Sequence, residues 1–376
     1  MKRYMTQENQ KNGNLSAILS YIMEHGASSR REIQEETGFS WGTVSEAAAQ
    51  LIARGYLTEE KDTRRGGAGR TGPVLKLSGG EVALIGVDLN LSGLTAEILG
   101  FDRTVKHTVR RPFPGGDQRT VLDAVLSLCD EAAAYCAGKY RVFAICIAVQ
   151  GAVDSAAGVS VRFPLAGGWI PCSLGQMLTE RYGVFAFVDH DPKCMLRAKA
   201  HELQAESAEP MDLMLIRVDQ GIGMSVMQGG RIAEDRDKME LGHTLSVYGG
   251  LPCKCGRRGC LEAYSSLSGI AARCGVSYGE VMREPEKYAD ILTDALRYLA
   301  IAVHNAAMLF YPHRIIFTGD AIAGDDGFLP RFSEIFDELE KAEGRRPIEL
   351  SADSGISAAA GAAMGAAAQA VKQLYI

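Results

Sequence analysis

The sequence lacks any long hydrophobic run. Its longest apolar stretches, such as residues 83–87 and 143–149, are much shorter than the roughly 18–20 residues that span a bilayer. The first ten residues also lack the apolar segment of a secretory signal. We therefore expect a protein that does not interact with a membrane and that resides in the cytoplasm.

No class of activity stands out in the composition. Hydrophobic residues make up 47% and charged residues 23%, close to the average for soluble globular proteins. The 376 residues suffice for two or three domains with a large buried core, which excludes a disordered chain. The nine cysteines are an odd number in a long chain, which favours reduced thiols or a metal site over a disulfide framework.

The net charge of −6 is distributed unevenly along the chain. Residues 1–80 carry a net charge of +2 and the remainder carries −8. Only the N-terminal part is therefore a candidate for binding nucleic acid. Its positive bias is mild and would also suit an ordinary solvated domain.

Three short amphipathic helices are predicted at the N-terminus. Apolar residues recur at helical spacing up to Gly26, again over about residues 29–36, and again after Ser40, a good N-cap. Two strand-like segments then flank a basic, glycine-rich stretch over residues 64–73. This order predicts a winged helix-turn-helix domain over residues 1–77. A small helical dimerisation domain is the alternative.

In a DNA-binding domain of this kind, the start of the third helix faces the base edges. That segment contains no arginine or lysine, which limits the DNA-binding hypothesis because arginine makes the commonest base-specific contact. The candidates for base contacts are Ser40, Trp41, Thr43 and Ser45. The candidates for phosphate or minor-groove contacts are Arg30, Arg31, Arg64, Arg65 and Arg70.

Beyond residue 79 an order of strands, helix and strand occurs twice. The first set comprises strands 82–89, 94–101 and 105–111, helix 121–136 and strand 141–149. The second comprises strands 184–188, 213–218, 224–228 and 231–232, helix 292–310 and strand 314–318. This duplication predicts two α/β lobes, over residues 82–195 and 196–355, with a cleft between them. An alanine-rich helix within residues 356–376 is expected to join the first lobe.

The most specific motif is Cys253-x-Cys255-x4-Cys260, with His243 ten residues before it. Three thiolates and one imidazole form a complete tetrahedral set for Zn²⁺, and no position remains for a catalytic water. We therefore predict a structural zinc ion held by His243, Cys253, Cys255 and Cys260. Buried free thiols are the alternative.

Two carboxylates lie close to this motif in the sequence. Glu240 precedes His243 by three residues, and Glu262 follows Cys260 by two. Carboxylates and an imidazole around a metal-stiffened loop suit a polyhydroxylated ligand. Surface carboxylates with unrelated roles are the alternative.

Together, these motifs resemble those of the ROK family (repressor, open reading frame, kinase). The resemblance rests on the cysteine loop, Glu-x-Gly-His at 240–243, Ala-Val-Gln-Gly-Ala-Val-Asp at 148–154 and Gly168-Trp169. The N-terminal domain resembles that of the repressor branch, which includes the xylose and N-acetylglucosamine repressors. Membership implies an actin-like, hexokinase-type fold of two lobes, homodimers or homotetramers, and a sugar bound in the cleft.

The resemblance also implies roles for individual residues. Asp191 matches the aspartate that serves as base in the kinases of the family. The positions that match sugar contacts are His190, Asp191, Glu240, His243 and Glu262. His190 and Leu165 stand where the family commonly has asparagine. Because leucine cannot hydrogen-bond a hydroxyl group, the ligand is either oriented differently or not a common hexose.

Three segments that match the phosphate-binding segments of the kinases are altered. Asn90 and Leu91 replace glycines in the first, Asp219 begins the second, and Asp320 adds a carboxylate to the third. Side chains obstruct the backbone approach that glycine permits, and the carboxylates repel a triphosphate. We therefore expect a sugar-responsive repressor that binds operator DNA and has no catalytic residues. A sugar kinase with an accessory DNA-binding domain and a regulator that senses no small molecule are the alternatives.

Overall fold

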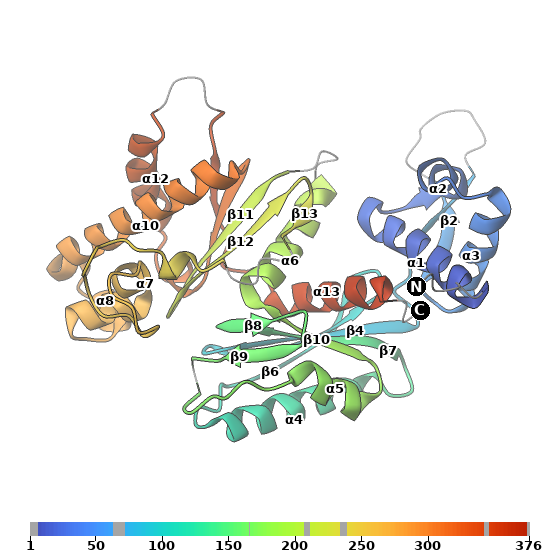
Figure 1. The fold of residues 1–376 in the computed structure, drawn as a ribbon, viewed down its shortest axis with the longest axis horizontal. Helices are drawn as coiled ribbons and strands as arrows, with labels where there is room; N and C mark the ends of the chain where they lie inside the picture. Colours follow the sequence, from blue (N-terminus) through green and yellow to red (C-terminus); the bar gives the residue numbers. More distant parts are fainter. Residues whose placement is uncertain are drawn as a thin grey trace, which may run out of the picture. The chain divides into compact units, whose positions relative to one another are not determined.

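The computed structural model describes residues 7–62, 72–164, 166–206, 211–233, 239–341 and 346–373 (Figure 1). The chain divides into two compact units. Unit 1 comprises Met1–Cys194 and Ala358–Ile376, and unit 2 comprises Met195–Ser357. No helix in the described part of the chain combines the length and the hydropathy that a bilayer span requires.

Unit 1 begins with three helices and a small sheet. The helices are α1 (Gln7–His25), α2 (Arg30–Thr37) and α3 (Trp41–Ala53), and the strand order is β1 (Ser28–Ser29), β3 (Pro73–Leu77), β2 (Leu57–Lys61). As predicted, Gly26 and Ser40 mark helix boundaries: Gly26 follows α1 with φ 76°, and Ser40 caps α3 by accepting a hydrogen bond from the Thr43 N–H. These elements form the predicted winged helix-turn-helix fold.

The first lobe is built on a five-stranded sheet. Its order is β10 (Phe185–His190), β7 (Arg141–Val149), β4 (Val82–Asn90), β5 (Gly93–Gly100), β6 (Val105–Arg111). The first three strands are parallel, and β5 and β6 continue antiparallel. Helices α4 (Gln118–Cys136) and α5 (Leu174–Tyr182) cover one face, and α13 (Ala358–Lys372) covers the other (Figure 1). A separate hairpin pairs β8 (Ala152–Asp154) with β9 (Val159–Arg162).

Helix α13 packs unusually closely because glycines remove side chains on both of its sides. A Cβ atom at Gly86 of β4 would lie 1.8 Å from the Ala359 carbonyl oxygen. One at Gly361 would lie 1.7 Å from the carbonyl oxygen of Cys194, in the first turns of α6 (Asp191–Glu206). Real Cβ contacts are never this short. Helix α13 can therefore pack against β4 and the start of α6 only because residues 86 and 361 are both glycine.

Unit 2 repeats the sheet of the first lobe. Its strand order is β13 (Arg231–Ile232), β12 (Ile222–Gln228), β11 (Leu213–Val218), β14 (Arg314–Thr318), β15 (Glu349–Ala352). Strands β11, β14 and β15 are parallel, whereas β12 and β13 are antiparallel. Helices α10 (Ala289–Phe310) and α12 (Phe328–Leu339) share its hydrophobic core. The predicted duplication of strands, helix and strand is therefore confirmed, and so is the two-lobed α/β fold class. One member of the second set was assigned wrongly: the strand expected at 184–188 is β10, which pairs with β7 in the sheet of the first lobe.

Short helices complete unit 2 between its strands. They are η1 (Leu241–His243), α7 (Glu262–Ser265), α8 (Leu267–Cys274), α9 (Tyr278–Val281), η2 (Pro285–Tyr288) and α11 (Asp320–Ala323). Of these, η1, α7 and α11 lie at the positions that the sequence marked as functional.

Candidate functional site

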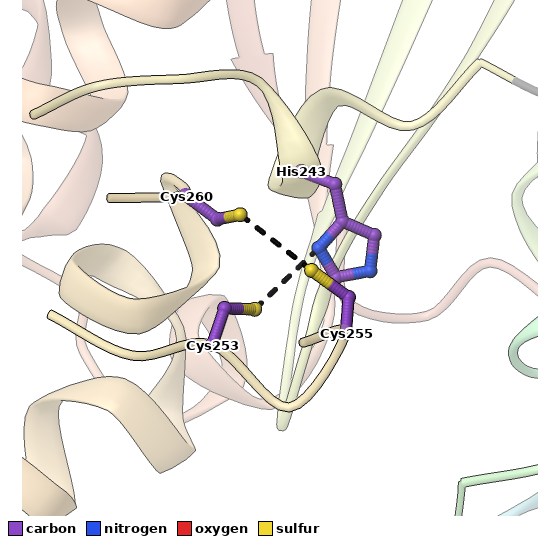
Figure 2. Close-up of side chains that lie close together, drawn as sticks. All are labelled: His243, Cys253, Cys255 and Cys260. Carbon is purple, nitrogen blue, oxygen red and sulfur yellow. Dashed lines mark hydrogen bonds between the residues drawn. The ribbon is translucent and has the colours of Figure 1, made fainter. Parts of the chain in front are cut away.

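The cysteine loop of unit 2 brings four potential metal ligands together (Figure 2). The sulfurs of Cys255 and Cys260 are 3.6 Å apart, and the Cys253 sulfur lies 3.7 Å from Nδ1 of His243. Zn–S and Zn–N bonds of ordinary length would give tetrahedral edges of about 3.6–3.8 Å. The group could therefore hold one metal ion at its centre.

The backbone of this loop is arranged to turn the sulfurs inward. Gly259 has φ 81°, and a Cβ atom there would lie 1.7 Å from the Val247 carbonyl oxygen. The Cys253 N–H donates to the carbonyl oxygen of Arg257 over 2.8 Å, which closes the turn between the first two cysteines and the third. Glycine is required at residue 259 because no other residue tolerates both this φ and this contact.

The thiols differ in how readily they ionise. Burial opposes ionisation of Cys255, but hydrogen bonds that Arg257 donates outweigh this effect and lower the pKa of Cys255 to about 6. Burial, reinforced by the neighbouring sulfurs, raises the pKa of Cys260 to about 12. A bound cation would favour the thiolate form of all three cysteines.

Glu240 and Glu262 both lie beside this loop. Glu240 immediately precedes η1, and its Oε2 lies 3.8 Å from Nε2 of His243, on the ring edge opposite the sulfurs. Glu262 is the first residue of α7, and its Oε2 accepts a 3.4 Å hydrogen bond from the Ile222 N–H. A Cβ atom at Gly221 would lie 2.7 Å from the same oxygen. The carboxylate of Glu262 thus lies against the β11–β12 hairpin.

In unit 1, Asp191 begins α6 directly after β10 and is 2% exposed. Nε2 of His190 lies 3.5 Å from its Oδ1. The neighbouring Asp189 accepts hydrogen bonds from the Ser155 hydroxyl (3.0 Å) and from the His190 N–H (2.9 Å). It also forms an ion pair with Lys193, whose Nζ lies 2.9 Å away. Asp189 and Lys193 are both buried.

The Asp189–Lys193 pair was not predicted from the sequence, although its i,i+4 spacing was a usable signal. Leu165, the other position that departs from the family pattern, lies outside the described residues.

The second and third altered phosphate segments meet in unit 2. Nε of Arg217 donates to Oδ2 of Asp219 over 2.5 Å, and both side chains are buried. The other carboxylate oxygen of Asp219 accepts the N–H of Asp320, at the start of α11. Asp219 therefore occupies backbone N–H and guanidinium donors that could otherwise bind an anion. Neither Arg217 nor this contact was predicted from the sequence.

In the first segment, the side chain of Asn90 closes the turn between β4 and β5. Its amide nitrogen donates to Oδ2 of Asp88 over 2.6 Å, and its Oδ1 accepts the Ser92 N–H over 2.8 Å. Leu91, next in the turn, is 43% exposed. The side chain of Asn90 thus stabilises this turn at a position where the kinase pattern has a glycine without a side chain.

The predicted base-contacting residues lie at the start of α3. Ser40 and Trp41 are exposed, Trp41 by 54%, while Thr43 and Ser45 are half-buried. Two of the predicted phosphate contacts are paired: Arg30 donates to both oxygens of Glu59 in β2, and Arg31 donates to Glu35. Arg64, Arg65 and Arg70 lie outside the described residues.

Comparison with known proteins finds relatives along most of the chain. It is 27% identical over 341 residues to the DNA-binding transcriptional dual regulator NagC of Escherichia coli K12, covering 84% of this chain and 82% of NagC. A crystal structure of a ROK family transcriptional regulator, a homologue of the E. coli MLC protein, superposes with a TM-score of 0.77 at 21% identity and 97% coverage of both chains. A ROK hexokinase from Thermus thermophilus superposes with a TM-score of 0.65 at 25% identity, covering 77% of this chain and 99% of the hexokinase.

Two family models match consecutive parts of the sequence. Residues 11–58 match a winged helix-turn-helix DNA-binding domain, over most of α1 and all of α2 and α3. Residues 84–373 match the ROK family, over the two lobes and α13. The chain therefore belongs to the ROK family and carries an N-terminal winged helix-turn-helix domain.

Proposed function

We propose that this protein is a sugar-responsive, DNA-binding transcriptional repressor. The observation that carries the proposal is the combination, in one chain, of a winged helix-turn-helix domain with a ROK domain whose phosphate-binding segments are filled by side chains. The similarity to NagC over more than four-fifths of both chains supports it.

Operator DNA is bound by residues 1–77 in this proposal. The exposed start of α3 enters the major groove, where Ser40, Trp41, Thr43 and Ser45 contact base edges. Arg64, Arg65 and Arg70 of the wing contact phosphates or the minor groove. Arg30 and Arg31 contribute positive charge from α2, although their pairing with Glu59 and Glu35 makes them secondary to the wing.

The effector is a sugar, and its proposed contacts are the residues that match sugar-contacting positions of the family: His190, Asp191, Glu240, His243 and Glu262. Carboxylates and imidazoles pair well with vicinal hydroxyl groups, since each carboxylate accepts two hydrogen bonds. A hundredfold change in operator affinity on sugar binding needs a coupling free energy of about 2.7 kcal/mol, within the usual range for allosteric proteins.

The metal of the cysteine loop is Zn²⁺ with a structural role. The fit of the four ligand atoms to tetrahedral edges supports zinc, and a complete protein ligand set suits a structural ion. Bound there, the ion would hold His243 with its Nε2 toward Glu240.

The ROK domain has lost kinase activity in this proposal. A nucleotide would have to displace Asp219 from the Asp320 N–H, which costs the buried Arg217–Asp219 pair as well. The likeness to a ROK hexokinase and the presence of Asp191 favour the alternative, a sugar kinase with an accessory DNA-binding domain.

A second copy of this chain covers a groove of about 870 Å³ in unit 2. Exposed apolar side chains line it, among them Leu245 beside the cysteine loop and Ile301 and Leu309 on α10. Ile301 and Leu309 are eight residues apart and so lie on one helix face, as a self-complementary interface requires. A dimer would also present two DNA-binding domains to two half-sites.

We predict one zinc ion per chain in protein purified without added metal, measured by elemental analysis. Cys255→Ser should lower the metal content at least fivefold and also weaken sugar binding, because Glu262 lies two residues beyond a metal ligand. Cys274→Ser, which changes a cysteine outside the group, is the matched control and should leave both unchanged. A folded chain with a metal ratio near zero would contradict the assignment.

DNA binding should disappear from a chain that lacks residues 1–77 and should depend steeply on salt in the full chain. Arg70→Ala should weaken binding to all sequences and reduce the slope of log affinity against log salt by about one. Thr43→Ala and Ser45→Ala should change which sequence is preferred. Mobility-shift titrations at several salt concentrations measure both effects, and undiminished binding by the shortened chain would refute the assignment.

The full chain should have at least the mass of a dimer in light scattering at micromolar concentration. Ile301→Asp together with Leu309→Asp should halve that mass, because both charges would be buried in the apolar groove. Leu339→Asp, at an exposed leucine on α12 outside the groove, should leave it unchanged. A wild-type monomer, or a double variant that keeps the wild-type mass, would exclude this interface.

A neutral hexose, pentose or N-acetylated amino sugar should raise the Tm without ATP, because a ligand of the native state stabilises it. No sugar that does so should be phosphorylated by the chain with ATP. Asp191→Asn should weaken sugar binding and leave the rate of phosphorylation at background. Sugar phosphate formed at about one per second or faster, the low end for kinases, would favour the kinase alternative.

A further inference from the structure

Two helices of the DNA-binding domain, α1 and α3, end at an arginine of the first lobe. Arg103 lies between β5 and β6, and its Nη2 donates to the Met23 carbonyl oxygen, in the last turn of α1, over 2.6 Å. Arg141 is the first residue of β7, and its Nη2 donates to the carbonyl oxygen of Arg54, the C-cap of α3, over 2.9 Å. Two separate segments of the lobe thus make the same kind of contact.

The chemistry of these contacts favours a fixed attachment. The last carbonyl groups of a helix have no partner within the helix and carry partial negative charge, so a guanidinium ion is a favourable partner there. Arg103 adopts φ 69°, which is uncommon for a residue other than glycine. The turn between β5 and β6 therefore holds Arg103 in a left-handed backbone conformation, and from this conformation its side chain reaches α1.

A cluster of aromatic rings packs against the side chain of Arg141. Tyr56, three residues after the end of α3, packs edge-on against Phe101 and Phe143 of the lobe, with 5.2 Å between ring centroids in both pairs. The guanidinium of Arg141 lies 5.1 Å from the Tyr56 ring centroid, and its Nη1 lies 3.3 Å from the Tyr56 hydroxyl. The three rings are buried, so the segment that follows α3 is part of the core of unit 1.

Helix α13 connects the same domain to the start of α6. At one end, Gly361 lies against the backbone of Cys194, three residues after Asp191. At the other end, the buried hydroxyl of Ser16 in α1 donates to the Val371 carbonyl oxygen over 2.7 Å. The ten residues between these contacts span about 15 Å of helix.

We propose that Arg103 and Arg141 are positioning residues that fix α1 and α3 of the DNA-binding domain to the first lobe, and that α13 transmits an effector signal from the start of α6 to α1. This proposal rests on the proposed function for its ligands, and it adds the route of regulation. A domain on a slack linker would be placed independently of the effector. A domain fixed at α1, α3 and α13 must follow the lobe, so the effector can change operator affinity.

The first test measures attachment without any ligand. In a Trp169→Phe chain, Trp41 of α3 is the sole tryptophan, and its fluorescence anisotropy should decay with the tumbling of the whole chain. Adding Arg103→Met and Arg141→Met should introduce a nanosecond component from independent motion of the domain. Arg119→Met, at an exposed arginine of α4, should not. Independent domain motion in the chain that retains both arginines would overturn the proposal.

The second test measures the coupling between sugar binding and DNA binding. The DNA is a duplex that the wild-type chain enriches from a random pool, and the sugar is the monosaccharide that most raises the Tm of the wild-type chain. Arg103→Met and Arg141→Met, singly, should bind the sugar with wild-type affinity. The sugar-induced change in DNA affinity should fall to a tenth of its wild-type value or less. Arg141→Lys, which keeps one donor for the Arg54 carbonyl, should recover part of the response.

The outcomes distinguish failure of the proposed function from failure of the positioning role. A wild-type chain that binds no DNA, or no sugar, contradicts the proposed function, while the anisotropy test still decides whether the domain is fixed. Wild-type binding of both ligands with an undiminished response in the two methionine variants overturns the positioning role. If the double variant fails to fold, the single variants and Arg141→Lys give the same decision.

Discussion

The close contact of α13 with backbone on two sides is the constraint on which most of unit 1 depends. Gly86 of β4 and Gly361 of α13 each face a carbonyl oxygen at a distance that excludes even a methyl group. The helix is therefore held against the sheet of the first lobe and against the start of α6 by direct backbone contact, which leaves no side-chain layer to absorb a shift. Because its last turn also accepts the Ser16 hydroxyl, the same helix sets the place of α1.

The two lobes share a sheet topology, and each has a buried acid next to the carboxyl end of a parallel strand. Asp189 is the penultimate residue of β10 and pairs with Lys193, and Asp219 follows β11 and pairs with Arg217. Ligands of open α/β sheets bind at these ends. A buried carboxylate paired with a cation is costly to disrupt, since either partner alone would be left as an uncompensated charge. These pairs thus fix the strand ends, and in unit 2 the pair also occupies the donors that a phosphate would need.

The cysteine loop illustrates how a local motif can organise a larger region. Its glycines and short hydrogen bonds turn four ligand atoms toward one point, and the histidine in that group lies next to Glu240. The last cysteine leads directly into α7, whose first residue, Glu262, reaches the β11–β12 hairpin. An ion at this point would therefore stiffen one segment and, through it, restrict two carboxylates that belong to the proposed sugar site.

The sequence by itself determined what depends on near neighbours. Helical and strand periodicities located most elements of the three domains, Ser40 marked the start of α3, and the cysteine spacing identified the candidate metal ligands. Two long helices were not predicted: half of the residues of α6 are polar or charged, and the apolar residues of α12 recur every four residues over one short segment. The local signal is weak in α6, whereas the spacing of Phe328, Phe332 and Phe336 in α12 was a usable helical signal that was missed.

Only the tertiary structure decided which polar groups meet. Asp219 binds the N–H of a residue 101 positions away, Glu262 reaches a hairpin 40 positions before it, and Arg103 binds a helix end 80 positions before it. Such pairs depend on the order of the strands and on how closely the helices pack. Neither can be predicted from a local sequence pattern. The residue types could suggest altered phosphate segments and a DNA-binding domain. The contacts that Asp219 makes in those segments, and the contacts that attach the domain to the first lobe, arise from chain topology.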